Sequence, residues 1–170
     1  FVNRYKLFFV DVLIGKKIVT AHCPNTGSMQ GLLIKGNKVW LSKSNNPNRK
    51  LKYTLQIIED DNSKVGVNTH QTNKIFLDAL ENNRIKEFNK NIKIKPEVKF
   101  GENTRFDFLI TDKNYKAFIE VKNVTLVRKP KIAEFPDAIT SRGTKHIHEL
   151  VKASKKGYEI YIAFIVQRED

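Results

Sequence analysis

The sequence predicts an α+β protein of two domains: an all-β barrel over residues 1–63 and an α/β domain over residues 64–170. Short apolar or alternating runs, separated by glycine, proline and asparagine, indicate the first domain. An order of helix, three strands, helix and strand indicates the second, because that order is typical of an α/β layer. The polar stretch at 61–64 marks the boundary between them.

Strands of the first domain are expected at 5–14, 17–22, 31–34, 38–42 and 53–59. Glycines and polar stretches punctuate them, as turns between short strands require. An OB-fold is the natural candidate for such a barrel, although an SH3-like barrel has the same pattern.

In the second domain, residues 72–89 carry apolar side chains near helical spacing, and Thr72 or Asn73 is a candidate N-cap. Strands are expected at 92–100, 105–111 and 117–126, a second helix at 138–154, and a final strand at 158–166.

The chain is strongly basic, with a formal net charge of +13 and a pI of about 9.8. Clustered lysine and arginine bind polyanions by releasing counterions, so the charge favours a nucleic-acid partner. The alternative is that coding bias alone produced a sequence rich in lysine and asparagine. With 40% apolar residues the composition is ordinary for a globular protein.

Cys23 is the only cysteine, which excludes an internal disulfide and a cysteine metal cluster and fits a reducing cytoplasm. No apolar run approaches the roughly 18 residues needed to span a bilayer, so no membrane association is expected. The opening stretch FVNRYKLFFV lacks a signal-peptide cleavage site and is interpreted as a first strand.

The stretch RFDFLITDKNYKAFIEVKNVT (105–125) predicts a hairpin whose tight turn is centred on Lys113 and Asn114. Pairing across that turn places Asp107 opposite Glu120, with Lys122 on the same face as Glu120. Opposed positions have Cβ atoms about 4.5–5.5 Å apart, so two carboxylates are expected to converge.

Two adjacent carboxylates repel each other unless a cation or a proton lies between them. Mg²⁺, or Mn²⁺ in its place, accepts one or two carboxylates and completes its shell with water and phosphate oxygens. Lys122 would then polarise or deprotonate an attacking water, or stabilise charge on the phosphate. This arrangement suits phosphodiester hydrolysis. A lysine–carboxylate salt bridge on a solvated face explains the same spacing equally well.

The pattern D-x12-E-x-K on adjacent strands after a helix resembles the PD-(D/E)XK nuclease superfamily. Longer blocks, in order along nearly the whole chain, resemble the sugar fermentation stimulation protein family. These blocks are HCPNTGSM (22–29), NRKLKYTL (48–55), VGVNT (65–69), RFDFLI (105–110), IEVKNVTL (119–126) and FPDAITSRGTKHIHEL (135–150).

The resemblance implies an N-terminal OB-fold, a C-terminal PD-(D/E)XK nuclease-like domain, and DNA binding linked to the regulation of sugar metabolism. It implies catalytic roles for Asp107, Glu120 and Lys122, with Asp107 and Glu120 as metal ligands. Members of the superfamily often work as homodimers. Members of the family usually continue past the stretch AFIVQRED, so a C-terminal truncation is expected here.

Glu97 is predicted as a further metal ligand, since an extra acidic residue often completes the site in this superfamily; pairing with Lys95 or Lys99 is the alternative. Arg142, Lys145 and His146 are predicted to contact phosphate at a helix N-terminus, where free N–H groups favour anions. The alternative there is an ordinary exposed basic helix. His146 is not expected to bind metal.

Arg4, Arg49 and Lys50 on the barrel, together with Arg105, complete the predicted nucleic-acid-binding set. Two functions remain open. The chain is a metal-dependent nuclease, or it is a non-catalytic DNA-binding regulator of sugar metabolism genes that uses the same cleft only to hold phosphate.

Overall fold

The computed structural model describes residues 1–61, 63–88, 91–102 and 104–170. They form two compact units, and neither is one continuous stretch of sequence. The first unit consists of Phe1–His70, Asn123–Ala138 and Val166–Asp170, and the second of Gln71–Lys122 and Ile139–Ile165.

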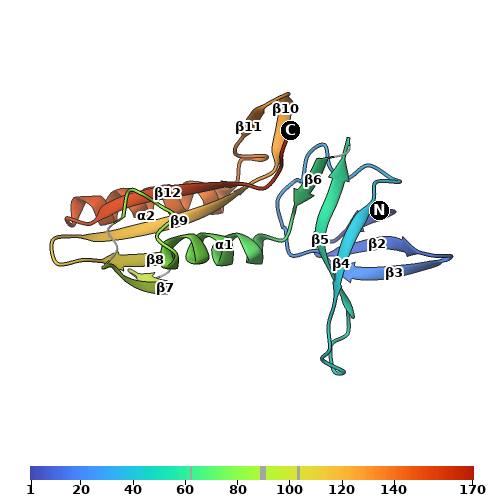
Figure 1. The fold of residues 1–170 in the computed structure, drawn as a ribbon, viewed down its shortest axis with the longest axis horizontal. Coiled ribbons are helices and arrows are strands. Elements are labelled where there is room, and N and C mark those ends of the chain that lie inside the picture. The colour runs from blue at the N-terminus through green and yellow to red at the C-terminus, as the bar shows by residue number, and fades with distance from the viewer. Residues whose placement is uncertain (62, 89–90, 103) are drawn as a thin grey trace. The chain divides into compact units, whose positions relative to one another are not determined.

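The first unit is built on a sheet with the strand order β1-β2-β3-β5-β4, in which β6 also pairs with β5 (Figure 1). Its strands are β1 (Asn3–Tyr5), β2 (Phe9–Ile14), β3 (Lys17–His22), β4 (Val39–Lys43), β5 (Tyr53–Asp60) and β6 (Ser63–Gly66). β2 and β3 form a regular antiparallel hairpin, whereas β3 meets β5 in parallel at His22 and Thr54. In sheet order, the described strand pairings extend from β1 at one edge to β4 at the other. Closure of this sheet into a barrel stays a prediction.

Two predicted strands of this unit are corrected by the structure. The expected strand at 5–14 is interrupted, because Lys6 and Leu7 adopt left-handed φ angles of 48° and 61°. The expected strand at 31–34 is a loop that follows a turn, in which the Leu32 amide donates to Met29 O over 3.1 Å. Leu32 is nevertheless fully buried. Its apolar side chain therefore packs in the core, although its backbone does not belong to a strand.

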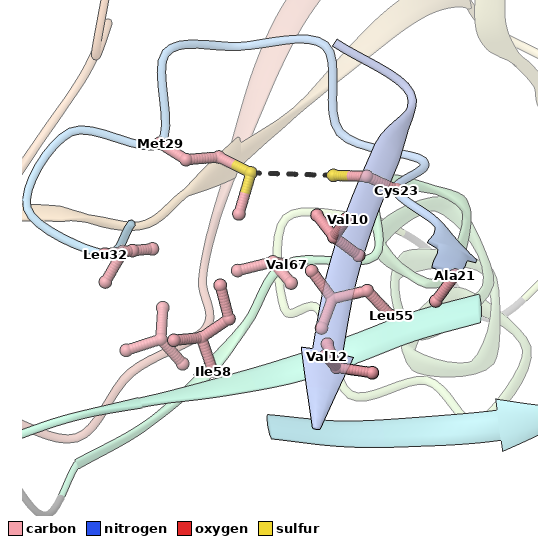
Figure 2. Close-up of a cluster of buried hydrophobic side chains, with 10 residues drawn as sticks. Val10, Val12, Ala21, Cys23, Met29, Leu32, Leu55, Ile58 and Val67 are labelled. Atoms are coloured by element: carbon pink, nitrogen blue, oxygen red, sulfur yellow. Dashed lines mark hydrogen bonds between the residues drawn. The ribbon is translucent and has the colours of Figure 1, made fainter. Parts of the chain in front are cut away.

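The core of the first unit joins side chains from the sheet with three from the loop that follows β3, namely Cys23, Met29 and Leu32. Figure 2 shows Val10, Val12 and Leu55 in one cluster with Cys23 and Met29, whose sulfur atoms lie 3.8 Å apart. All five are fully buried. Burial raises the pKa of the Cys23 thiol, which therefore acts as a small apolar core residue and not as a nucleophile.

The loop after β3 is held in place by a cation and a carboxylate. The Arg4 guanidinium donates to Asn25 O at 2.6 Å and to Gly27 O at 2.8 Å. Asp137 Oδ2 accepts the Met29 amide at 2.9 Å. A Cβ added to Gly27 would lie 2.9 Å from that same oxygen, so only glycine leaves room for the contact. Residues of the sequence blocks HCPNTGSM and FPDAIT therefore contact each other in the structure.

Later segments complete the first unit. A hairpin that the sequence did not predict is formed by β10 (Leu126–Lys129) and β11 (Ile132–Glu134). Gly66 N donates to Gln167 O at 2.9 Å. The nearly buried guanidinium of Arg168 reaches Thr125 O at 2.7 Å and Asp60 Oδ2 at 2.9 Å.

The second unit is a four-stranded sheet with the order β12-β9-β8-β7 and two helices (Figure 1). Its elements are α1 (Thr69–Glu81), β7 (Lys93–Phe100), β8 (Thr104–Thr111), β9 (Lys116–Val124), α2 (Ser141–Lys155) and β12 (Glu159–Val166). Ile119 of β9 packs in one buried cluster with Phe76 of α1, while its neighbour Phe118 packs in another with Leu150 of α2. Since neighbouring strand residues point to opposite faces, the helices cover opposite faces of the sheet.

Both ends of α1 differ from the prediction. The helix begins at Thr69, and the Asn68 side chain accepts the His70 amide at 3.0 Å, so neither Thr72 nor Asn73 is the N-cap. It ends at Glu81 because Asn83 adopts a left-handed φ of 54°, and the Arg84 amide turns back to Ala79 O at 2.8 Å. Asn89, the last residue of the predicted helix, lies outside the described residues.

No helix among the described residues is both long and apolar enough to cross a bilayer.

Replacing Asp137 tests how much its contact with the loop after β3 stabilises the fold. Asp137→Ala should lower the free energy of unfolding by about 1–3 kcal/mol, because it leaves the Met29 amide without its acceptor. Asp137→Asn keeps an oxygen that can accept from the Met29 amide, so its free energy of unfolding should fall much less. Urea unfolding followed by the fluorescence of Trp40 measures both. Equal losses would contradict a role for the hydrogen bond.

Candidate active site

The predicted register of the β8–β9 hairpin is correct up to the acidic residues and ends there. The described ladder runs from Thr111 and Lys116 to Phe108 and Ile119. The next pair would be Asp107 with Glu120. Instead the Val121 amide donates to Asp107 Oδ2 at 2.7 Å, so a side chain takes the amide that a strand partner would otherwise bind.

β8 also loses its regular alternation at this point. Phe106 packs against Phe118 in the cluster on the α2 side, with ring centroids 4.9 Å apart. Phe108, two residues on, packs instead against Phe76 of α1. A regular strand would place both rings on one face. The irregularity therefore lies around Asp107.

As a result the two carboxylates are held by different helices. Asp107 Oδ1 accepts from the Asn73 amide of α1 at 2.8 Å. Glu120 Oε1 lies 2.5 Å from Lys122 Nζ and 2.5 Å from His146 Nδ1 of α2. Because a carboxylate oxygen accepts and Nδ1 must donate to it, the imidazole hydrogen is assigned to Nδ1.

Glu120 is the most confined charged group of the site. Only 3% of the residue is exposed, and both of its partners are largely covered. Oε1 has two donors, whereas Oε2 is buried and has no hydrogen-bond partner among the described residues. Leaving a buried acceptor unsatisfied costs about 1–3 kcal/mol, and more when it is charged.

The pKa of Asp107 is raised above its ordinary value, first by burial and then by the negative charge of Glu120. The Val121 amide, the Asn73 amide and the charge of Lys122 oppose this increase without cancelling it. A half-buried carboxyl whose pKa is raised by burial and by a neighbouring carboxylate marks a candidate functional site.

A divalent cation fits this donor set. It would pair with the unpartnered Oε2 of Glu120 and would offset the repulsion that raises the pKa of Asp107. Mg²⁺ needs only one or two protein carboxylates. Among the described residues, however, no group of three or more His, Cys, Asp or Glu side chains gathers in a way that could hold a metal ion.

Glu97, the predicted third acidic ligand, does not support the site as expected. It has a left-handed φ of 54° in β7, and its side chain is 57% exposed. Its nearest charged partner is Arg105, with Oε2 and Nη1 3.8 Å apart. A metal role for Glu97 stays a prediction that the geometry does not favour.

A hollow of about 510 Å³ is lined by Arg105, Ser141, Arg142, Lys145 and His146. The structure therefore brings together the predicted basic residues of the second unit. They stand at the start of α2, where Thr140 caps the helix by accepting the Gly143 amide at 3.0 Å. The other predicted nucleic-acid ligands lie in the first unit.

In the first unit, Arg4 already donates to three backbone carbonyls, and Arg49 donates to Thr54 Oγ1 at 2.7 Å. Lys50 is exposed. Lys50 is therefore the predicted ligand of this unit best placed for phosphate, while Arg4 holds the loop after β3.

Sequence reasoning missed two partners of the acidic pair. Asn73 was considered only as a helix cap, although it lies three and seven residues before Phe76 and Leu80, which are buried on one face of α1. His146 was assigned to phosphate alone, although it lies one turn before the buried Leu150. In both cases helical spacing to the buried face was the available signal.

These features define a protein that joins a β-sheet unit to an α/β unit with a buried acidic site. Residues 2–67 match the family model described as the SfsA N-terminal OB domain, and residues 70–170 match the sugar fermentation stimulation protein RE domain. The chain belongs to the sugar fermentation stimulation protein family, as the sequence blocks predicted, and its N-terminal domain is an OB domain.

Relatives and a solved structure agree. The chain is 59% identical over 168 residues to the sugar fermentation stimulation protein homolog of Pelagibacter ubique, covering 99% of this chain and 72% of the relative. The Geotalea uraniireducens homolog is 43% identical over 170 residues, with 99% and 73% covered. The structure of Pyrococcus furiosus SfsA in complex with Ca²⁺ matches with a TM-score of 0.88 at 28% identity, covering 98% of this chain and 70% of that one.

The raised pKa of Asp107 predicts how stability depends on pH. A carboxyl whose pKa is higher in the folded state stabilises the fold below its unfolded pKa, and this contribution is lost as the pH rises through the folded pKa. Asp107→Asn keeps only one of the two oxygens that accept from Asn73 and Val121, but it removes the pH-dependent cost, so without metal its free energy of unfolding should gain on that of wild type towards neutral pH and this gain should shrink on acidification. Urea unfolding at a series of pH values measures this. A gain that does not change with pH would contradict it.

A double-mutant cycle tests the contact between His146 and Glu120. His146→Ala and Glu120→Gln should be coupled by roughly 0.5–3 kcal/mol in unfolding free energy, because each removes one side of the same short contact. Arg142→Ala with Glu120→Gln is the matched control and should be nearly additive. If His146 served only as a phosphate contact, its cycle without nucleic acid would also be additive.

Proposed function

We propose that this chain is a metal-dependent nuclease that hydrolyses phosphodiester bonds of nucleic acid, with DNA as the first candidate, and that its second unit has the PD-(D/E)XK nuclease fold. One observation carries the proposal: Glu120 is buried with Oε2 unpartnered among the described residues, beside a second carboxyl whose pKa it raises. A purely structural salt bridge would not require the second carboxyl or the unsatisfied oxygen.

Asp107 and Glu120 would hold the ion, which we propose to be Mg²⁺ or Mn²⁺. The Pyrococcus furiosus relative is described in complex with Ca²⁺, which supports binding of a divalent cation by oxygen ligands. When bound, the ion would supply positive charge that polarises the phosphate and activates water.

The protein's own groups prepare the site for that chemistry. Asn73 and the Val121 amide fix the orientation of the Asp107 carboxylate. Lys122 and His146 fix Glu120 through Oε1 and leave Oε2 for the cation. Lys122 also keeps an ammonium charge where negative charge develops on the reacting phosphate, which lowers the barrier when it is pre-positioned.

Nucleic acid as the substrate is supported by three features. The net charge is +13, the first domain is an OB domain, and OB domains commonly bind nucleic-acid strands. The basic hollow contains His146, which also contacts Glu120, so phosphate-binding groups adjoin the acidic pair. The proposal includes a homodimer, as the resemblance implies.

A non-catalytic DNA-binding regulator of sugar metabolism genes remains the second candidate. It is favoured by the position of Glu97, since no third acidic residue joins Asp107 and Glu120 among the described residues. In that case the site would hold phosphate through the cation without cleavage.

Cleavage assays decide between the two functions. Labelled single- and double-stranded DNA and RNA are incubated with Mg²⁺ or Mn²⁺ and with wild type, Asp107→Ala or Lys122→Ala. The nuclease proposal expects metal-dependent cleavage by wild type, reduced in both variants by at least about a hundredfold, the size typical for removing one transition-state group. Binding without cleavage under all conditions would favour the regulator.

Metal binding has a readout independent of activity. Ca²⁺ or Mg²⁺ in a hundredfold excess over its dissociation constant should stabilise the wild-type fold by about 2.7 kcal/mol. Glu120→Gln should abolish this stabilisation, whereas Glu97→Gln, which changes an exposed carboxylate, should preserve it. Loss of the effect in Glu97→Gln would show that Glu97 is a ligand after all.

A further inference from the structure

One line of α2 carries most of its cationic side chains. Arg142, Lys145, Glu149, Lys152 and Lys156 follow one another at intervals of three or four residues, the spacing that keeps side chains on one side of a helix. The buried Leu150 of α2 lies on a different side, whereas the buried Ala153 borders the line, three residues before Lys156. We call this line the α2 basic stripe.

Two hollows lie along the α2 basic stripe and share one residue. The first, already described, includes Arg142, Lys145 and His146. The second has a volume of about 520 Å³ and is lined by Phe100, Gly101, Glu102, Thr104, Lys145, Glu149, Lys152, Lys155 and Lys156. Since Lys145 lines both, they follow each other along the helix from the acidic site towards its C-terminal end.

The second hollow is positive in balance. Glu149 is paired with Lys152 at 2.7 Å, and this lysine is the main reason why the pKa of Glu149 is lowered. Lys156 lies 5.2 Å from the centre of the Phe100 ring and is thereby held over the hollow. Lys152, Lys155 and Lys156 are all exposed, so their charges remain accessible to a ligand.

We propose that the α2 basic stripe is the path along which a nucleic-acid backbone leaves the acidic site, with the second hollow holding phosphates several nucleotides away from the bond that reacts. This inference rests on the proposed function and adds to it the direction of the strand. The fifteen residues from Arg142 to Lys156 are separated by fourteen steps and span about 21 Å of helix. At about 3.4 Å per nucleotide of duplex strand, this length follows about six nucleotides.

The contacts would be to phosphates and not to bases. The lining offers lysine charges, and its one ring, Phe100, is buried at 9% exposure and cannot stack on a base. Contacts of this kind position a strand without reading its sequence. Binding along the stripe is therefore independent of base sequence and sensitive to salt.

The test compares two triple variants of equal charge. Lys152→Gln, Lys155→Gln and Lys156→Gln are combined in the stripe variant. Lys93→Gln, Lys113→Gln and Lys116→Gln form the control; these three are exposed at the hairpin end of the sheet, where Lys93 and Lys116 both pair with Thr111. Fluorescence anisotropy with a labelled DNA strand and its duplex, in Ca²⁺ and at several salt concentrations, gives the affinities.

The stripe variant should lower the slope of log affinity against log salt concentration by about 2–3, since each lost phosphate contact removes about 0.7–0.9. The slope of the control variant should differ from that of wild type by no more than the value of about one phosphate contact. A triple Lys→Arg variant of the stripe should restore the wild-type slope. Equal loss in both glutamine variants, or no loss in the stripe variant, would overturn the proposal. Thermal melting of each variant excludes unfolding as the cause.

Cleavage is measured separately on the same proteins. The control variant should keep the wild-type rate, because its substitutions leave Asp107, Glu120 and Lys122 in place, whereas the stripe variant should need a higher DNA concentration to reach its half-maximal rate. If wild type binds DNA with the expected slope but does not cleave it, the nuclease proposal fails while the strand path stands. If wild type binds no nucleic acid at all, the strand path fails.

Discussion

A buried carboxylate that has, within the described part of the chain, hydrogen-bond donors to only one of its two oxygens is the constraint around which the second unit is organised. A carboxylate at 3% exposure is costly to bury without partners, and the chain supplies donors to Glu120 from β9 through Lys122 and from α2 through His146. Both reach the same oxygen. The position of α2 on the sheet, the burial of His146 and the orientation of Lys122 are all linked to this one atom.

The end of regular strand pairing at Asp107 follows from the same constraint. Two carboxylates directly opposed on one face of a ladder would repel at close range. In the structure the ladder stops one pair earlier, Asp107 is bound by Asn73 of α1 and by the Val121 amide, and Glu97 leaves the β conformation on the neighbouring strand. Irregular strands near functional sites commonly aim a side chain in this way. The regular strand pairing therefore ends where the carboxylates of Asp107 and Glu120 must lie apart and still interact electrostatically.

Sequence reasoning was strong where local chemistry decides and weak where tertiary contacts do. The turn at Lys113 and Asn114 gave the correct hairpin register, and the segments of β3, β5, β8 and α2 were close to their observed bounds. The catalytic and metal-binding roles of Asp107, Glu120 and Lys122 stay predictions. Their geometry was not predictable, because the change of face at Asp107 depends on packing against two helices. The predicted strand at 31–34 was wrong for a similar reason. Leu32 is apolar because it packs in the core, and it does not belong to a strand.

The interleaving of the two units has a consequence for synthesis on the ribosome. The OB domain occupies residues 2–67, yet its unit takes contacts from Gln167 to Gly66 and from Arg168 to Asp60 and Thr125. At about 5–20 residues per second, roughly 5–20 s separate translation of Gly66 from that of Arg168. During that interval the strand edge at Gly66 lacks its final partner, and the nascent first unit cannot reach its finished form. A segment that is translated late thus supplies the contacts for a strand edge that was translated early.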